Sequence, residues 1–310
     1  MKKFRIGYFA DGPWSHEAFK LLNADNTIEI AFVVPRTNTE DLTLYNFSKE
    51  NKIDYLKNVN INSDGFIEGV KGYDCDLFVS MSFNQIFKKE IMKIPKLNTI
   101  NCHAGKLPFY RGRNVLNWVL INDEREFGIT VHYIDDGIDT GDILLQRTYP
   151  ITDKDNYSSL LKVATKQCAI ILYDAIKLIV ADDLMTVKQN EIDSIGFYCS
   201  RRKVGDEIID WNQSSRKLFN FIRALNQPEG PGARSYLKGH EIIINSAKMN
   251  NDAPQYIDIP GSIVGKKGNS FIVKTTDSSI EVSDYVYNKR INIGDRLKQI
   301  NKNNDSVQNI

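Results

Sequence analysis

The stretch NTINCHAGKLPFYRGRN, residues 98–114, joins a short apolar run to a loop that carries an amide, an imidazole and three cations. A short apolar run bounded by turn residues is typical of a buried strand. In open α/β sheets, ligands bind just outside the carboxyl ends of the strands. The placement of Asn101 and His103 at such a strand end therefore predicts an α/β sheet with a polar site at its edge.

The flanking sequence predicts that this sheet is mostly parallel. Short apolar runs alternate with amphipathic segments, the pattern of parallel strands joined by crossover helices. We expect strands at 4–10, 28–35, 76–82, 98–103, 128–135 and 143–151. We expect helices at 16–22, with Ser15 as the N-cap, and at 41–51, 87–94, 114–122 and 157–180. The predicted fold is a Rossmann-like α/β sheet with helices on both faces.

The second half predicts a small additional domain. Beyond about residue 185 the pattern changes to a turn-rich stretch, QPEGPGAR, and then to short strand-like runs punctuated by glycines. Such runs are typical of a small β-barrel of the OB-like type. The expected organisation is a catalytic domain at 1–185, a linker region at 186–235, a small C-terminal β-barrel domain at 236–300 and a disordered polar tail at 301–310.

The charge balance bears on the class of ligand. The 310 residues include 40 Lys and Arg against 39 Asp and Glu. This balance argues against nucleic-acid binding, which favours a basic excess, whereas two or three placed cations suffice for a small anion. The four cysteines have no C-x-x-C spacing, and we find neither a signal-peptide pattern nor an apolar run of roughly 18 residues. We expect a cytoplasmic protein that binds neither nucleic acid nor membrane.

The strand-end pair has a chemical interpretation. Asn101 and His103 lie two residues apart on extended chain, so their side chains point to the same side. An amide can donate to a developing oxyanion, and a neutral imidazole can take or relay a proton. The pair suits attack of an amine on a carbonyl, with a carboxylate of the loop at 134–142 to orient the imidazole. The alternative stays open, since a strand-end His often only bonds to backbone.

Other polar residues form weaker patterns. The loop at 134–142 has four carboxylates, but their spacing does not match an EF-hand, and no His or Cys lies at zinc-ligand spacing near His103. We therefore expect no metal. We interpret Trp118 as a core residue. The other three histidines are interpreted as structural: His16, His132 and His240.

The combined motifs resemble those of the formyltransferase family that uses 10-formyltetrahydrofolate. The family pattern is N-x-H at a strand end, then L-P-x-[FY]-R-G, then D-x-G. This chain has N-C-H at 101–103, L-P-F-Y-R-G at 107–112 and D-T-G at 139–141, with the family's spacing. The motifs I-D-W, I-R-A and P-G-A, between residues 209 and 233, extend the resemblance into the second half. It covers nearly the whole chain and implies the small C-terminal barrel of the larger members.

The resemblance implies roles for individual residues. Asn101, His103 and Asp139 would form the catalytic triad. The pterin of 10-formyltetrahydrofolate would lie against two loops, through Gln85, Ile86 and Phe87 in one and Asp135, Asp136 and Ile138 in the other. One departure from the pattern is Gly105, which stands where several relatives have a Ser.

The resemblance also suggests the acceptor. The run YRGRNVLNWVLIN, residues 110–122, is most similar to family members that formylate nucleotide-linked amino sugars. We expect a dTDP-linked 4-amino-4,6-dideoxy-hexose, used in surface-polysaccharide synthesis such as that of the lipopolysaccharide O-antigen. Arg113 and Lys106 would bind the diphosphate, and Asn117 would bind a sugar hydroxyl. An aromatic ring would stack on the base, from Trp14, Tyr198 or Trp211. Surface charge or core packing is the alternative for each.

Three other functions stay open at this level. Methionyl-tRNA formyltransferase shares the fold, triad and barrel, but would need a basic face for tRNA. A non-catalytic folate or nucleotide binder would have no need to keep all three triad residues. A formylfolate hydrolase would use water in place of the amine. The sequence does not fix the base, the position of the amine or the oligomeric state, for which a homodimer is one option.

Overall fold

A computed structural model describes residues 2–57, 60–250 and 252–298, so the predicted tail at 301–310 lies outside the described residues. The chain divides into two compact units. Unit 1 comprises Met1–Val115, Glu126–Pro150 and Lys162–Ser200. Unit 2 comprises Leu116–Arg125, Ile151–Leu161 and Arg201–Ile310. Each unit is described by itself.

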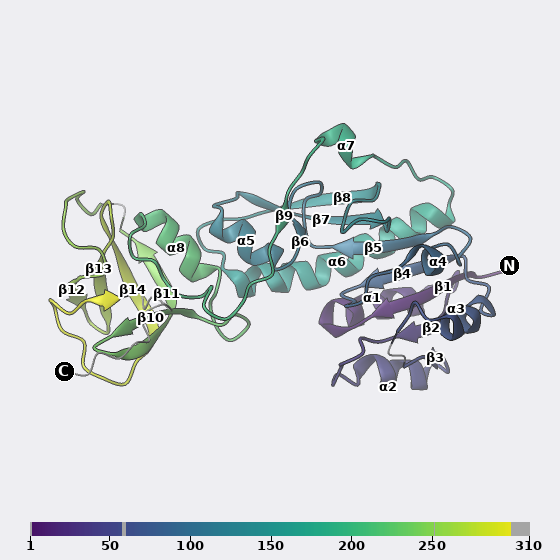
Figure 1. Ribbon diagram of the computed structural model, residues 1–310, viewed down its shortest axis with the longest axis horizontal. Helices are drawn as coiled ribbons and strands as arrows, with labels where there is room; N and C mark the ends of the chain where they lie inside the picture. Colours follow the sequence, from purple (N-terminus) through teal and green to yellow (C-terminus); the bar gives the residue numbers. More distant parts are fainter. Residues whose placement is uncertain (1, 58–59, 251, 299–310) are drawn as a thin grey trace. The chain divides into compact units, whose positions relative to one another are not determined.

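Unit 1 is built on a seven-stranded sheet (Figure 1). In spatial order its strands are β3 (Asp54–Tyr55), β2 (Ile28–Val34), β1 (Phe4–Ala10), β4 (Leu77–Met81), β5 (Thr99–His103), β7 (Glu126–Tyr133) and β8 (Ile143–Pro150). The strands from β3 to β5 pair in parallel, whereas β7 is antiparallel to both β5 and β8. The predicted mostly parallel sheet is confirmed, with antiparallel strands at one edge.

Helices cover both faces of this sheet, as predicted (Figure 1). The helices up to residue 192 are α1 (Gly12–Ala24), α2 (Thr43–Glu50), α3 (Asp64–Lys71), α4 (Lys89–Met92), α5 (Val115–Ile121), α6 (Tyr157–Val180) and α7 (Gln189–Ile192). Tyr8 donates its hydroxyl to the carbonyl of Ser15 in α1, while the ring of Phe9 meets Phe66 of α3. Because neighbouring strand residues point to opposite faces, α1 and α3 lie on opposite sides of β1.

The start of α1 differs from the prediction. Ser15 was expected to be the N-cap, but α1 begins at Gly12, and the fully buried Ser15 donates its hydroxyl to the Gly12 carbonyl at 2.7 Å. Pro13 lies in the first turn, where a missing N–H costs nothing. The helix therefore begins one turn before the apolar pattern that suggested it. The sequence also failed to predict α3, whose two glycines lower its helix propensity.

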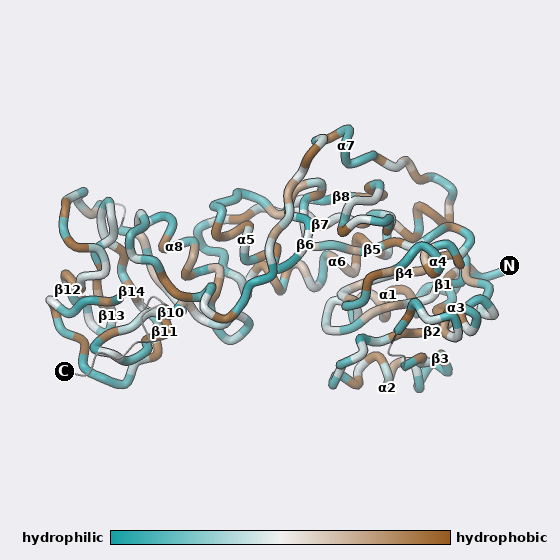
Figure 2. The backbone as a smooth tube through the Cα atoms, in the orientation of Figure 1, coloured by the Kyte–Doolittle hydropathy of each residue, from teal (hydrophilic) through white to brown (hydrophobic). Residues whose placement is uncertain are grey.

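The core on the α3 side of the sheet is aromatic. Phe9, Phe32 and Phe78 are fully buried and meet one another with ring centroids 5.1–5.7 Å apart. Gly7 makes this packing possible, since a Cβ there would lie 2.5 Å from the Phe32 ring. All of β4 is buried and is drawn in the hydrophobic colour in Figure 2. This central position fixes the strand ends that carry the polar loops.

The carboxylate of Asp25 joins the end of α1 to α6. It accepts hydrogen bonds from the Tyr173 hydroxyl at 2.8 Å and from Lys177 Nζ at 2.9 Å, and it caps the backbone N–H of Thr27. The bonds from Lys177 and Thr27 lower the pKa of Asp25 below its usual range. Asp25 is therefore ionised in the folded protein under ordinary conditions.

Replacing Asp25 by Ala is expected to lower the free energy of unfolding by about 1 kcal/mol, because partly buried donors lose a charged acceptor. The folded-state pKa is depressed, so this contribution is present above the unfolded pKa of about 4 and is lost as pH falls. Urea unfolding of both proteins from pH 7 to pH 3 should show a difference that shrinks with acidification. The exposed Asp183→Ala serves as control. A pH-independent difference would contradict the ionic origin.

Unit 2 contains the second predicted sheet. Its six strands lie in the order β12 (Ile263–Lys267), β13 (Ser270–Lys274), β14 (Ser279–Val286), β11 (His240–Met249), β10 (Ala233–Leu237) and β15 (Leu297–Lys298). The pairings are antiparallel, and α8 (Ser215–Arg223) precedes them. Leu297 N donates to Gly261 O at 2.9 Å, which brings β15 to the segment before β12. The sheet curls into a half-barrel, as the predicted small β domain requires.

Two short strands complete the described part of unit 1. β6 (Arg111–Gly112) pairs in parallel with β9 (Tyr198–Cys199), so the segment after α7 returns to the loop that follows β5. In the described part of the chain, no helix is long and apolar enough to cross a membrane.

Candidate active site

The polar side chains of β5 face those of β7. Asn101 lies opposite His132 in the antiparallel register, and opposed residues of neighbouring strands project from the same face. Asn101 Nδ2 is 3.2 Å from His132 Nε2. His103 follows Asn101 on the same face of β5. The sheet pairing therefore adds an imidazole that the sequence analysis had assigned a structural role.

The carboxylate of Asp139 lies between the two imidazoles. Its Oδ2 is 3.7 Å from His103 Nδ1, and its Oδ1 is 3.6 Å from His132 Nε2. Gly112 N donates to Oδ2 at 2.9 Å. All three side chains are largely buried, with exposed fractions of 11% for His103, 2% for His132 and 14% for Asp139. The structure thus brings together the three predicted triad residues and adds His132.

The loop that carries Asp139 does not reach the site as predicted. A parallel strand would bring the loop at 134–142 to the carboxyl-end edge of the sheet beside His103, but β7 is antiparallel, so its carboxyl end lies beside the amino end of β5. Ile134 N accordingly donates to Thr99 O at 2.8 Å. The loop is a hairpin between β7 and β8 that turns back over the sheet to bring Asp139 to His103. The predicted path of this loop to the site was wrong, because in an antiparallel strand the carboxyl end lies at the opposite edge of the sheet.

The surroundings of Asp139 keep it ionised. Burial by itself would raise the pKa of this carboxyl. The charge of His103, the interaction with His132 and the N–H of Gly112 outweigh burial and hold the pKa of Asp139 well below its usual range. A permanent negative charge therefore faces the two imidazoles.

Hydrogen bonds to carbonyl groups fix the proton positions on the imidazoles. His103 Nε2 is 2.7 Å from Tyr110 O, and a carbonyl only accepts, so Nε2 carries a proton. His103 Nδ1 faces the Asp139 carboxylate, which also only accepts, so the imidazolium form fits this geometry best. His132 Nδ1 donates to Tyr133 O, leaving Nε2 to accept one N–H of Asn101. Among the described residues the second Asn101 N–H has no recorded acceptor, so it is available to a ligand.

Gly105 provides the space for the His103 ring. A Cβ at this position would lie 2.4 Å from Tyr110 O and 2.5 Å from His103 Nε2. Such distances do not occur in real proteins, so a side chain would displace either the imidazole or the backbone that receives its proton. Gly105, which stands where several relatives have a Ser, therefore leaves room for the His103 imidazole at its position in this chain.

Replacing Gly105 by Ser, the residue of those relatives, is expected to lower turnover by about tenfold to a hundredfold. The reason is that a shift of about 1 Å in a reacting group can cost a hundredfold in rate. Steady-state kinetics of Gly105→Ser would measure it, with Gly69→Ser on the exposed side of α3, where a Cβ meets nothing, as the control. Full activity of Gly105→Ser would show that the imidazole position tolerates a side chain.

The two predicted cofactor loops lie next to each other. Lys89 Nζ of α4, just beyond the loop at 83–88, is 4.0 Å from Asp136 Oδ2, and both side chains are exposed. Ile86 and Ile138 are also exposed, at 73% and 57%, which is unusual for isoleucine. Two exposed apolar side chains on neighbouring loops suit the flat face of a pterin.

The other predicted cofactor residues have internal contacts. The Phe87 ring is buried and packs on Phe9 at 5.0 Å, so only its main chain is available to a ligand. The Gln85 side chain accepts from Ile61 N, while its Nε2 is buried and has no partner among the residues that the structure describes. Asp135 accepts from Gly137 N and from the Thr140 hydroxyl, which shapes its own loop.

Two predicted acceptor residues are corrected by the structure. Asn117 is 4% exposed and donates its amide to Ala224 O at 2.6 Å, so it holds the end of α8 and cannot reach a sugar. Trp211 is 3% exposed and donates its indole N–H to the Ser235 hydroxyl, so its ring belongs to the core of unit 2. The sequence pattern could not separate these buried polar contacts from ligand contacts.

The remaining acceptor candidates differ in their surroundings. Lys106 Nζ pairs with Glu126 Oε1 at 2.5 Å, and this pairing lowers the pKa of Glu126. Trp14 is half-buried in the first turn of α1. Tyr198 is 54% exposed and stacks on Arg111, whose guanidinium carbon is 5.4 Å from the ring centroid. Arg113 is exposed beside Gly112.

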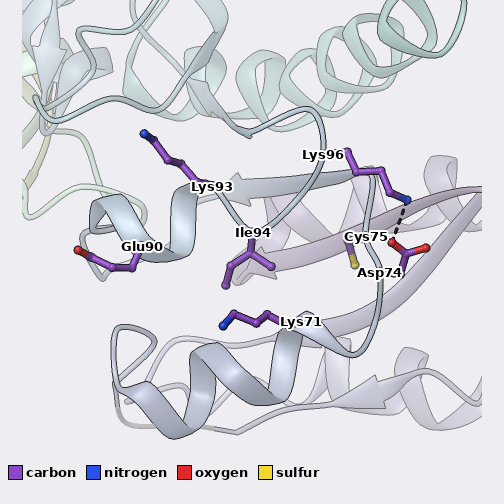
Figure 3. Close-up of a pocket in the computed structure, with 7 residues that line it drawn as sticks. All are labelled: Lys71, Asp74, Cys75, Glu90, Lys93, Ile94 and Lys96. Atoms are coloured by element: carbon purple, nitrogen blue, oxygen red, sulfur yellow. Dashed lines mark ion pairs between the residues drawn. The ribbon is translucent and has the colours of Figure 1, made fainter.

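A shallow depression elsewhere on unit 1 lacks comparable chemistry (Figure 3). Lys71 of α3 and Glu90 of α4 line it, together with Lys93. Asp74 and Lys96 point toward each other across it and pair at 3.0 Å. Its charges are largely compensated, so it does not compete with the site on β5. Within the ranges that the structure describes, no three His, Cys, Asp or Glu side chains are grouped to hold a metal ion.

Comparison with known proteins places both halves of the chain. A family model described as formyl transferase matches residues 26–176, and one described as formyl transferase, C-terminal domain, matches residues 202–299. The chain is 31% identical over 264 residues to the methionyl-tRNA formyltransferase of Fusobacterium nucleatum subsp. nucleatum, covering 81% of this chain and 84% of that protein. It is 36% identical over 243 residues to the bifunctional polymyxin resistance protein ArnA of Wigglesworthia glossinidia brevipalpis, covering 77% of this chain but only 36% of that longer protein.

Solved structures share the fold. WlaRD, a sugar 3N-formyl transferase crystallised in the presence of dTDP and 5-N-formyl-THF, superposes with a TM-score of 0.69 at 22% identity, covering 93% of this chain and all of that one. An N-formyltransferase from Helicobacter canadensis, in complex with folinic acid and dTDP-3-aminofucose, gives 0.67 at 21% identity, covering 92% of this chain and all of that one. At these identities the likeness establishes the architecture alone.

Proposed function

We propose that this chain, which belongs to the formyl transferase family, formylates the amine of a dTDP-linked 4-amino-4,6-dideoxy-hexose in surface-polysaccharide synthesis. Family membership makes it a formyltransferase that takes the formyl group from formyl-tetrahydrofolate. The acceptor is the part that the proposal adds. It rests on the cations next to the triad.

The observation that carries the proposal is the state of the three cations after His103. Lys106 is paired with Glu126, and Arg111 is buried and bonded to Gln189. Arg113 is exposed, and among the described residues nothing pairs with its guanidinium. A single placed guanidinium beside the triad suits a diphosphate, which it can bind through two parallel hydrogen bonds. A polynucleotide would require many such contacts.

The proposed chemistry uses the proton positions of the site. Asn101 donates its free N–H to the formyl oxygen as negative charge develops there. His103 turns its Nε2 from Tyr110 O to the reacting atoms, gives a proton to the leaving nitrogen and takes the proton that the attacking amine loses. Asp139 stabilises the imidazolium that is present before the first transfer and is restored by the second, and His132 holds the Asn101 amide. The number of protons on the enzyme is unchanged after one turnover.

The loop positions support the folate side of the proposal. The pterin would bind to the main chain of residues 85–87 and to the loop of Asp136 and Ile138, which the Lys89–Asp136 pair brings side by side. The exposed Ile86 and Ile138 side chains would lose contact with water when the pterin is bound.

Replacing Arg113 by Ala is expected to raise KM for the nucleotide sugar by about tenfold or more, because a charge-assisted contact of about 1.5–3 kcal/mol is lost. KM for the formyl donor should stay unchanged. Lys106→Ala is the matched control, since Lys106 has the same charge but is already paired. Equal KM values for Arg113→Ala and Lys106→Ala would contradict a diphosphate at Arg113.

A second candidate acceptor, methionyl-tRNA, is favoured by the distribution of charge. Residues 201–298 carry 16 Lys and Arg against 11 Asp and Glu, whereas residues 1–200 carry 23 against 27. The near-neutral balance of the whole chain therefore conceals a basic C-terminal segment at 201–298, so net charge is a weaker reason to exclude tRNA than it first appeared. Curated relatives at 31% identity are named methionyl-tRNA formyltransferases. The two acceptors must be compared directly.

A further inference from the structure

The loop of Asp139 is held by a buried side chain that the proposed chemistry does not use. Gln189, the first residue of α7, is 3% exposed. Its Nε2 donates to Asp139 O at 2.9 Å and to Gly141 O at 2.8 Å. Both hydrogens of one amide are therefore used on the main chain around the triad carboxylate. Sequence reasoning assigned no role to Gln189.

A buried guanidinium fixes the orientation of this amide. Arg111 is 7% exposed, and its Nε and Nη2 donate to Gln189 Oε1 at 3.1 Å and 2.7 Å. Its Nη1 donates to Ile195 O at 3.2 Å. A guanidinium only donates and a carbonyl only accepts, so the Gln189 amide fits between them in one orientation. The oxygen must face Arg111 and the nitrogen must face the loop.

The restrained loop has an unfavourable backbone conformation. Asp139 has φ +55°, in the left-handed region that is unfavourable for a residue other than glycine. Gly141 lies so close to Tyr133 O that a Cβ there would be 1.9 Å from it. A loop of this kind needs outside contacts to keep one conformation. The Gln189 amide supplies two of these contacts, one on each side of Thr140.

We propose that Gln189, oriented by Arg111, is a positioning residue that holds the Asp139 carboxylate against His103 and the Gly112 N–H. The role in catalysis rests on the proposed function, since it matters only if Asp139 acts in formyl transfer. The positioning of the Asp139 carboxylate does not depend on that function, since it involves only atoms of this chain. Arg111 lies in the same L-P-F-Y-R-G run as Gly112, so one short segment supports the carboxylate directly through Gly112 and indirectly through Gln189.

The variant Gln189→Glu keeps the contact of residue 189 with Arg111 but removes its hydrogen bonds to the Asp139 loop. A glutamate keeps an oxygen for Arg111, so the buried guanidinium stays paired. It replaces the N–H groups with an oxygen facing two carbonyls, which repels the loop. We expect kcat to fall by about tenfold to a hundredfold, with both KM values within about threefold of wild type. Gln167→Glu is the control, because Gln167 bonds to Tyr149 and not to the loop.

An NMR signal provides a readout independent of any acceptor. The Gly112 N–H donates to Asp139 Oδ2, and a proton bonded to a carboxylate resonates downfield. In Gln189→Glu this resonance should move toward its position in Asp139→Asn, while Gln167→Glu leaves it unchanged. If Gln189→Glu does not fold, Gln189→Met, which lacks both the donor and the repelling oxygen, is measured in the same way.

The outcomes are distinct. A displaced Gly112 resonance with lowered kcat supports the proposal. An unmoved resonance in a folded variant overturns it, whether or not kcat falls, because Asp139 would then be held without Gln189. A displaced resonance with wild-type kcat also overturns it, since the position of the carboxylate would not matter for turnover. If the wild-type protein turns over no acceptor, the proposed function fails, and the resonance alone decides whether Gln189 positions Asp139.

Discussion

Replacing His103 by Asn is expected to lower kcat for formyl transfer by at least about a hundredfold, which is about 2.7 kcal/mol of transition-state stabilisation. His103 lies 3.7 Å from Asp139 and 2.7 Å from Tyr110 O, so its two nitrogens are placed between an anion and a group that the substrate can replace. An asparagine can still donate one hydrogen bond, but it cannot give and take a proton. The variant therefore removes proton transfer while keeping the size and polarity of the side chain similar.

The companion variant Asp139→Asn should show a loss of the same order. An amide cannot stabilise the imidazolium by charge, and it can present an N–H to the Gly112 N–H, which would turn the side chain away. Circular dichroism and the unfolding midpoint should stay close to those of wild type for both variants, since neither residue belongs to the apolar core. Near-normal turnover by folded His103→Asn would contradict the mechanism.

The double variant His103→Asn, Asp139→Asn adds a test of cooperation. Residues that act as one unit show strongly non-additive effects, because the second loss removes nothing further. The double variant should therefore be about as slow as the slower single variant. Multiplied losses would indicate that the two residues act independently.

The sequence predicted the fold, and the shared face of Asn101 and His103, because both follow from local patterns. The apolar runs of β1, β2 and β4 are nearly continuous, which is typical of strands covered on both faces, and the helix at 157–180 has a clear three- and four-residue repeat. Asn101 and His103 share a face because they are two residues apart on one strand. Relationships between residues that are close together in the sequence can be predicted from the sequence alone.

The direction of β7 was not predictable in the same way. An isolated apolar strand does not show whether it runs parallel or antiparallel to its neighbour, and that choice placed His132 opposite Asn101. A signal was present in the sequence: His132 is an ionisable residue inside the largely apolar run GITVHY, which was predicted to be a strand. Burying an imidazole there costs free energy unless it has partners, which Asn101 and the Tyr133 carbonyl provide.

The predicted contacts of Asn117 and Trp211 with the acceptor substrate do not agree with the structure, for a related reason. Asn117 and Trp211 were selected because amides and indoles often bind ligands, but both satisfy donors and acceptors inside unit 2. Nothing in their local sequence distinguishes a contact with Ala224 or Ser235 from a contact with a sugar. Gln189 illustrates the reverse case: it lies in an exposed stretch with no motif, yet bonds to the main chain of the triad loop.

The central claim concerns the acceptor, and here the expected difference is the largest of all. A nucleotide sugar makes two phosphate contacts, so its binding should depend weakly on salt, whereas tRNA binding falls steeply because counterions are released at each contacted phosphate. Binding of a nucleotide sugar would depend on Arg113, whereas binding of tRNA would depend on the basic segment at 201–298. The two acceptors thus predict opposite behaviour in one assay.

The most direct test is to measure initial rates of formylation by the full chain with formyl-tetrahydrofolate, offering dTDP-4-amino-4,6-dideoxyglucose or methionyl-tRNA at salt concentrations from low to physiological. Isomers with the amine at the 3-position and the UDP-linked sugar complete the panel. We predict saturable formylation of a dTDP-linked amino-hexose, with KM changing only a few-fold over this range, and no turnover of methionyl-tRNA. Steeply salt-sensitive formylation of methionyl-tRNA, with no turnover of any nucleotide-linked amino sugar, would contradict the account.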